Sequence, residues 1–110
     1  MKKLIFLPLF AIAIYCCTPK AKVAPAPEFS DADVARGKVF WNDCSVANLS
    51  SAKALYNGKC GTCHALKPLY SMDETGWRKI VPPMAKKANL SAAEQALILN
   101  YVLTMKDARK

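Results

Sequence analysis

The stretch Cys60-Gly61-Thr62-Cys63-His64 carries the most specific chemical signal in this sequence. Its C-x-x-C-H spacing is the signature of covalent haem attachment. Two thiols at this separation can add across the two vinyl groups of one haem. The imidazole that follows directly then lies beneath the iron and can bind it as the proximal ligand. The motif therefore predicts one covalent haem c per chain, with the histidine as an iron ligand.

Two other interpretations of the paired cysteines are open. A structural zinc site needs four Cys or His ligands, whereas this chain has one His and only Cys44 as a further uncommitted thiol. A redox dithiol of the thioredoxin type needs a βαβ context, and the sequence contains no convincing alternating strand. Haem c is the favoured interpretation, with a metal site and a redox dithiol as the alternatives.

The first residues have the pattern of an export signal. The charged residues 1–3 precede an apolar run, residues 4–15, which is too short to span a bilayer comfortably and is typical of a signal peptide. An apolar run that leads directly into a cysteine resembles a bacterial lipoprotein signal. We therefore predict a signal peptide at residues 1–16 and a lipidated Cys17. Lipidation of Cys16, an uncleaved anchor and an ordinary secretory signal are the alternatives, and all of them export the domain.

Residues 17–48 are expected to comprise the lipid-attachment cysteine, a proline-rich tether and an N-terminal extension. Residues 18–28 hold three prolines and no aromatic residue, which indicates an extended tether, with a surface loop as the alternative. Ser30 and Asp33 then have the spacing of a capping box. They predict a short helix that is interrupted at Gly37.

Three further residues of this extension have expected roles. Phe40 and Trp41 are expected to cover part of the domain. No second C-x-x-C-H follows Cys44, so a second haem is not expected. Cys44 is expected to be a small buried apolar residue, and a disulfide to another chain is the alternative.

Residues 49–110 are expected to form the haem-bearing domain. Its first helix covers residues 49–58, because small and apolar side chains recur there at helical spacing. Ser50 or Ser51 is expected to be the N-cap of this helix. The haem motif begins two residues after its end.

Two S-x-x-E capping boxes open the other helices of the domain. The box at residues 71–74 starts a helix that is expected to stop before Pro82-Pro83, because proline disfavours helical geometry in the residue before it. The box at residues 91–94 starts the most regular helix of the chain. Its apolar stripe extends to about Lys106.

The second axial ligand of the iron is expected to be a methionine, because His64 is the one histidine of the chain. The candidates are Met72, Met84 and Met105. Met105 belongs to the apolar stripe of the last helix, and Met72 lies in a helix cap. Met84 follows a rigid two-proline break, which favours it as the ligand. The carbonyl of Pro68 is a candidate acceptor for the second ring N–H of His64, and a plain turn is the alternative.

Several stretches between Leu49 and Lys110 share the order and spacing of one family. They are Tyr56, Cys60-Gly61-Thr62-Cys63-His64, Gly76-Trp77-Arg78-Lys79, Pro83-Met84-Ala85 and the final helix with Tyr101. On these residues the chain resembles a small class I cytochrome c. The resemblance implies that the first and last helices cross beside the haem, and that the methionine comes from the loop before the last helix. It also implies thioether bonds to Cys60 and Cys63 and axial ligation by His64 and Met84.

The fold implied by this resemblance is all-α, a small cytochrome c-like domain of three to four short helices packed around a covalent haem. A domain of roughly sixty residues buries a marginal core by itself, so the haem would supply much of the apolar interior. The span from His64 to Met84 is short for the family, which implies a more exposed haem edge. The partners of the haem propionates stay open, with Trp77 and Arg78 as candidates.

The charge of the chain suggests its partner. The net charge is +8, and residues 49–110 carry ten basic and four acidic side chains, whereas residues 17–48 carry four of each. A basic face around an exposed haem edge would steer docking to an acidic redox protein or oxidase, and a generally basic surface is the alternative. Nucleic acid is not an expected partner of an exported haem protein, and the oligomeric state is open.

These features together predict a monohaem c-type cytochrome that carries single electrons between partners on the periplasmic side of a bacterial membrane, attached by an N-terminal lipid. A His/Met pair fills both axial positions of the iron, so the sequence does not predict an enzyme. Two alternatives remain. One is a haem-based ligand-binding or sensing domain, and the other is a dedicated electron-transfer subunit of a larger oxidoreductase.

Overall fold

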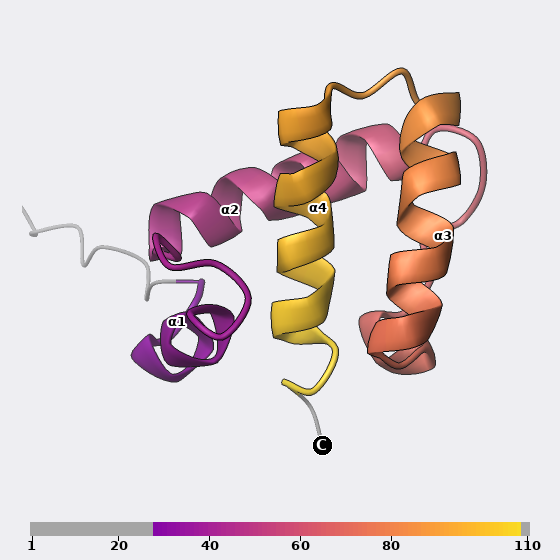
Figure 1. The fold of residues 1–110 in the computed structure, drawn as a ribbon. Helices are drawn as coiled ribbons and strands as arrows, with labels where there is room; N and C mark the ends of the chain where they lie inside the picture. Colours follow the sequence, from indigo (N-terminus) through magenta and orange to yellow (C-terminus); the bar gives the residue numbers. More distant parts are fainter. Residues whose placement is uncertain (1–27, 109–110) are drawn as a thin grey trace, which may run out of the picture.

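The computed structural model describes residues 28–108, which form four α-helices and no strand (Figure 1). The helices are α1 (Asp31–Gly37), α2 (Val46–Leu55), α3 (Glu74–Lys87) and α4 (Ala92–Met105). A π-helical turn, η1 (Tyr56–Cys60), continues α2, and a 3₁₀ turn, η2 (Leu69–Ser71), precedes α3. The predicted all-α class is therefore confirmed for the described residues.

Several predictions concern residues before this part of the chain. The signal peptide at residues 1–16, the lipidation site at Cys17 and most of the proline-rich tether lie outside the described residues. Between residues 28 and 108, none of the helices has the length and apolar character needed to cross a membrane.

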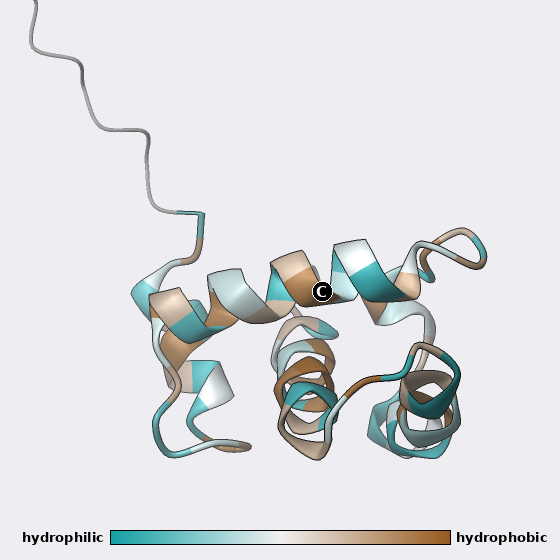
Figure 2. Ribbon diagram, turned by 90° about the horizontal axis from the view of Figure 1, so that it is seen from above, coloured by the Kyte–Doolittle hydropathy of each residue, from teal (hydrophilic) through white to brown (hydrophobic). Residues whose placement is uncertain are grey.

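Helix α4 is the centre of the fold, since α1, α2 and α3 all pack against it. It runs alongside α3 and crosses α2 (Figure 1). Seen from above, much of α4 is apolar (Figure 2), and Ile98, Tyr101, Val102 and Leu103 are buried. A helix with neighbours on several sides buries more than one stripe.

The predicted start and end of α4 are confirmed. Ser91 is the N-cap, and its hydroxyl accepts a hydrogen bond from the Glu94 amide at 3.1 Å. The Glu94 carboxylate in turn accepts from the Ser91 amide at 2.8 Å, which completes the capping box. The helix ends at Met105, and Lys106 is its C-cap.

The N-terminal extension shares the core of the helices that follow it. Phe29, Trp41 and Cys44 belong to the same buried cluster as Leu49. The ring of Phe29 packs edge-on against Tyr101, with 6.3 Å between the ring centroids. Trp41 is buried and the partly buried Phe40 packs against the same cluster, so the expectation that both cover part of the domain is confirmed. Cys44 is buried, as one of its two interpretations required.

Helix α1 begins and ends as predicted. Ser30 is its N-cap and forms a capping box with Asp33. The backbone amide and hydroxyl of Ser30, together with the Arg36 guanidinium, donate to the Asp33 carboxylate and lower its pKa. The last residue of the helix is the buried Gly37.

Helix α2 begins earlier than predicted. Its N-cap is Ser45, whose hydroxyl accepts from the Asn48 amide at 3.1 Å. Ser50 and Ser51 lie inside the helix, so the prediction that one of them caps it was wrong. The earlier start brings Leu49 into the helix, on the face that also buries Ala52. The free energy gained by burying this leucine favours a start at Ser45 over one at Ser50 or Ser51.

Helix α3 also begins differently from the prediction. Asp73 is its N-cap, and the Asp73 carboxylate accepts from the Gly76 amide at 2.8 Å. Ser71 lies in η2 instead, where its amide donates to the Pro68 carbonyl at 3.0 Å. The predicted capping box of Ser71 and Glu74 was therefore wrong, because a carboxylate two residues further on takes the cap.

The predicted stop before Pro82-Pro83 was wrong as well, because α3 continues through both prolines to Lys87. Each proline removes one helical N–H and crowds the carbonyl four residues earlier. The two carbonyls concerned belong to the exposed residues Arg78 and Lys79, where water can bind them. Burial of the opposite face of the helix offsets the cost. The buried residues of that face are Trp77, Val81 and Ala85.

Candidate functional site

The C-x-x-C-H motif begins in the π-helical turn that ends α2. Turns of this kind widen a helix locally and are frequent at functional sites. Cys60 is the last residue of the turn and is half-buried, whereas Cys63 and His64 lie in the exposed loop that follows. The Thr62 hydroxyl donates to the Lys59 carbonyl at 2.7 Å and closes the first part of this loop.

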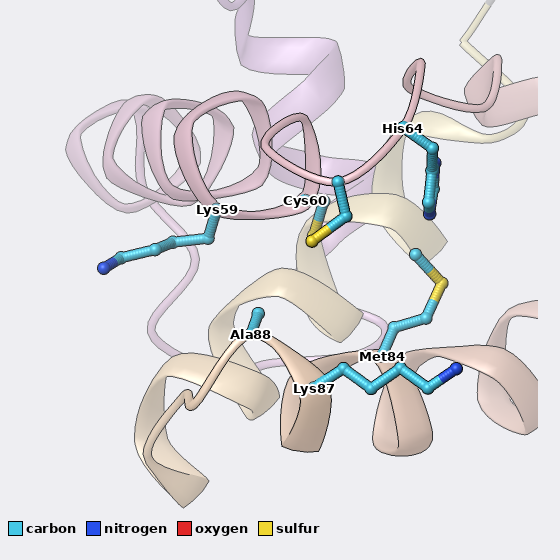
Figure 3. A pocket seen from close by; sticks show the side chains of 7 residues that line it. Lys59, Cys60, His64, Met84, Lys87 and Ala88 are labelled. Carbon is cyan, nitrogen blue, oxygen red and sulfur yellow. The ribbon is translucent and has the colours of Figure 1, made fainter.

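A cavity of about 180 Å³ lies between this loop and α3. The motif supplies both of its cysteines and its histidine to the wall, and α3 supplies Met84. The lining residues are Lys59, Cys60, Cys63, His64, Met84, Lys87 and Ala88. Figure 3 shows the imidazole of His64 and the thioether of Met84 pointing toward one another across this space.

A second, smaller cavity of about 10 Å³ shares part of this wall. Cys60, His64 and Met84 line both spaces, and Tyr56 and Trp77 lie along the smaller one. We call the larger space the outer cavity and the smaller one the inner cavity. The predicted ligands thus lie between an exposed mouth and the aromatic core.

Of the three candidate methionines, Met84 is the one that lines these two cavities. Met72 lines a different pocket beside Asp73, and Met105 lines a groove with Phe29 and Tyr101. Met84 is presented by a helix, and not by the rigid turn or loop that the sequence and the resemblance predicted. Ligation by Met84 stays a prediction, whereas the turn or loop expected to present it was wrong, because α3 continues through both prolines.

The ring of His64 is oriented by its own loop. Its Nδ1 atom lies 2.8 Å from the Ala65 carbonyl, which accepts the ring N–H when the proton is on Nδ1. This tautomer leaves the Nε2 lone pair available to a metal. The predicted acceptor, the Pro68 carbonyl, instead accepts from the Ser71 amide. Ala65 takes the place of Pro68 as the acceptor because its carbonyl is next to the ring in the chain.

The two cysteines of the motif are free thiols, as is Cys44. Burial raises the pKa of the Cys60 thiol, so this sulfur stays protonated at neutral pH. Within residues 28–108, no three side chains of the His, Cys, Asp and Glu types gather as a metal-binding group.

The contacts of Trp77 and Arg78 do not support their predicted role as partners of the haem propionates. The Trp77 indole donates to the Leu69 carbonyl at 3.0 Å, and Arg78 forms an ion pair with Glu74 at 2.8 Å. The cationic side chains at the outer cavity are Lys59 and Lys87. No local sequence pattern pairs these two lysines, because Lys59 belongs to η1 and Lys87 to α3.

The side chains that line the outer cavity fit a covalent haem, but the volume of the cavity is too small for one. Two free thiols, an imidazole with one ring nitrogen engaged and an opposed thioether are the groups that such a haem needs. The outer cavity is smaller than the ~300–1,000 Å³ of pockets that enclose ligands of moderate size. The exposed segment 61–66 forms one wall, so it would move away from Met84 to admit the group.

Comparisons of the chain with protein-family models, with curated proteins and with solved structures found no significant match.

Proposed function

We propose that this protein is a monohaem c-type cytochrome that carries single electrons between redox partners. One observation carries the proposal. The C-x-x-C-H loop and Met84 of α3 line the same cavity, with the imidazole of His64 and the thioether directed toward one another (Figure 3).

Each of the four residues has a distinct role in this proposal. Cys60 and Cys63 form the thioether bonds to a haem, and His64 and Met84 are the axial ligands. Haem held there supplies a one-electron iron couple. The Ala65 carbonyl orients the imidazole, and such an outer hydrogen bond raises the basicity of a histidine ligand. A thioether ligand favours the reduced state and raises the potential.

Electron transfer is a better proposal than catalysis for this site. A His64/Met84 pair occupies both axial positions, which leaves no open position for a substrate at the iron. A haem-based sensing domain needs the opposite, a position that is vacant or easily vacated. The way in which Met84 is supported favours a stable ligand, because the helix that presents it is packed against α4.

The proposed partner is an acidic redox protein or oxidase. Lys59 and Lys87 lie at the outer cavity, where a haem edge would be nearest to solvent. Positive charge at that place would steer an acidic surface to the electron-transfer edge and make association dependent on ionic strength. Nucleic acid is not proposed as a partner.

We further propose that the domain works on the periplasmic side of a bacterial membrane, held by a lipid on Cys17. The support for this placement is the apolar N-terminal run that ends in two cysteines, together with the proposed covalent haem, since haem c is attached outside the cytoplasm.

The test uses full-length protein expressed with the haem c maturation machinery. Visible spectra should show a sulfur-to-iron charge-transfer band in the oxidised form, and the reduced form should not bind carbon monoxide. Carbon monoxide binding without that band would favour the sensing alternative. Purification from membranes under mild conditions tests the alternative of a dedicated electron-transfer subunit. Stable association with one larger oxidoreductase would support that alternative.

A further inference from the structure

The loop that carries His64 is exposed along most of its length, from Gly61 to Pro68. Several of its hydrogen bonds are local, such as those of Thr62 to Lys59 and of Ser71 to Pro68. Local bonds shape a loop but do not fix its position relative to the helices. A precise ligand position therefore needs contacts between the loop and the core.

Two side chains of the core supply such contacts at the end of the loop. The Tyr56 hydroxyl donates to the Lys67 carbonyl at 2.7 Å, and the Trp77 indole N–H donates to the Leu69 carbonyl at 3.0 Å. The anchored carbonyls are two residues apart and follow His64 within five positions. The donors come from η1 and from α3, on the two sides of the inner cavity.

Both donors are themselves held firmly. Tyr56 is 6% exposed and Trp77 is 2% exposed. Their rings pack edge-on at 6.4 Å, and Tyr101 of α4 supports Tyr56 at 5.9 Å. Each hydrogen bond thus joins a backbone carbonyl at the end of the loop to a side chain that the core restrains.

The position of Trp77 connects this anchoring to the proposed ligands. Trp77 and Met84 are seven residues apart in α3, which is close to two helical turns, so they share one face. Both line the inner cavity with His64. The helix that presents the thioether is therefore the same helix that holds the end of the histidine loop.

We infer that Tyr56 and Trp77 are positioning residues for the axial ligand pair. Their hydrogen bonds hold residues 67–69 against η1 and α3, and so limit how far His64 can move from Met84. Segment 61–66 stays free to move outward when haem enters, while the anchored end keeps its place. This role rests on the proposed function, because a ligand pair matters only if the site holds haem.

The test compares Tyr56→Phe with a matched control. Tyr56→Phe keeps the buried ring and removes only the hydroxyl that anchors Lys67. Tyr101→Phe removes the hydroxyl of a second buried tyrosine, in contact with the first, which donates to neither anchored carbonyl. Hydrogen exchange of the Ser71 amide and of the Trp77 indole N–H reports on the loop end, and the amides of α4 report on the global fold.

The expected result is exchange at the loop end that is roughly fivefold faster in Tyr56→Phe, with unchanged exchange in α4. In haem-loaded protein, the same variant should weaken the sulfur-to-iron band, and Tyr101→Phe should leave it unchanged. Trp77→Phe provides a second variant, which is followed by exchange of the Ser71 amide and by the sulfur-to-iron band, because it lacks the indole N–H. Unchanged loop-end exchange and an unchanged band in both Tyr56→Phe and Trp77→Phe would overturn the inference. Faster exchange of the α4 amides in both variants would also overturn it, because it would indicate a general loss of stability.

The two proposals fail in different ways. The protein could fail to acquire covalent haem while Tyr56→Phe still speeds hydrogen exchange at the loop end. This result would support the anchoring and refute the electron-transfer function. A normal His/Met spectrum that is insensitive to Tyr56→Phe and Trp77→Phe would refute the positioning role and support that function.

Discussion

Trp77 and Met84 lie two turns apart on one face of α3, and both line the inner cavity together with His64. The relationship places a hydrogen-bond anchor and a candidate iron ligand on one rigid element. It also means that the two prolines between them must be accommodated without breaking the helix. The continuity of α3 through residues 82 and 83 is thus a requirement of the site.

Met84→Ala is expected to remove the sixth ligand while leaving the covalent haem in place. The oxidised protein should lose its sulfur-to-iron band, and the reduced protein should begin to bind carbon monoxide. The potential should fall by on the order of 0.1 V or more, a modest part of the ~0.8 V that axial ligands span. Visible spectra and a redox titration measure all three effects.

The other two candidate methionines serve as controls for this experiment. Met72→Ala and Met105→Ala should keep the band, because these residues line other pockets. Met105→Ala should lower stability, by less than the ~2–5 kcal/mol of a fully buried methionine, since it is only partly buried. Retention of the band in Met84→Ala together with its loss in Met72→Ala would show that the ligand assignment is wrong.

Gly37→Ala is expected to destabilise the fold by about 1–3 kcal/mol. A Cβ at this position would clash with the sulfur of Cys44 and lie 2.9 Å from Nε1 of Trp41, where the buried core has no free space. Gly58→Ala is the matched control, because a Cβ there meets no atom within 4 Å. Urea unfolding should show a lower midpoint for Gly37→Ala alone, and equal midpoints would contradict the packing described for α1.

Tyr56 should make the fold sensitive to alkaline pH. Burial raises the pKa of its hydroxyl from 10.0 to about 12 in the folded protein. The neutral phenol is the form that the fold favours, so this contribution is complete below pH ~10 and is lost as pH rises through 12. The loss amounts to about 2–3 kcal/mol. Tyr56→Phe should abolish this part of the pH dependence in unfolding experiments between pH 9 and 12, and an identical profile would contradict it.

The mature chain is expected to begin at a lipidated Cys17. The prediction rests on the apolar run that ends at Cys16-Cys17, which lies outside the described residues. Intact mass spectrometry of membrane-extracted protein measures the N-terminus directly. A retained Met1 or an unmodified cysteine would exclude it, and a chain that begins at a lipidated Cys16 would move the cleavage site by one residue.

Local signals in the sequence were sufficient for much of the fold. The boxes at Ser30 and Ser91 predicted two helix starts, because a short polar side chain and an acid three residues later satisfy each other's backbone donors. The apolar spacing of α4 predicted its extent. These features depend on residues within one helical turn, and tertiary packing did not oppose them.

Other features could not be predicted because they depend on distant residues. Proline inside a helix costs ~3 kcal/mol by local rules, and only the packing of α3 on α4 explains why the helix continues. The hydrogen bonds from Tyr56 to Lys67 and from Trp77 to Leu69 join separate elements, so no local sequence pattern predicts them. Met84 was named as a ligand candidate for its position after two prolines, although a helix presents it.

The most direct test of the proposed function is the mass of the denatured protein after expression with the haem c maturation machinery. We expect one haem covalently bound per chain, its loss in the Cys60→Ala, Cys63→Ala double variant, and weaker retention in either single variant. A wild-type chain that carries no covalent haem, or a double variant that keeps it through denaturing electrophoresis, would show that this protein is not a c-type cytochrome of the proposed kind.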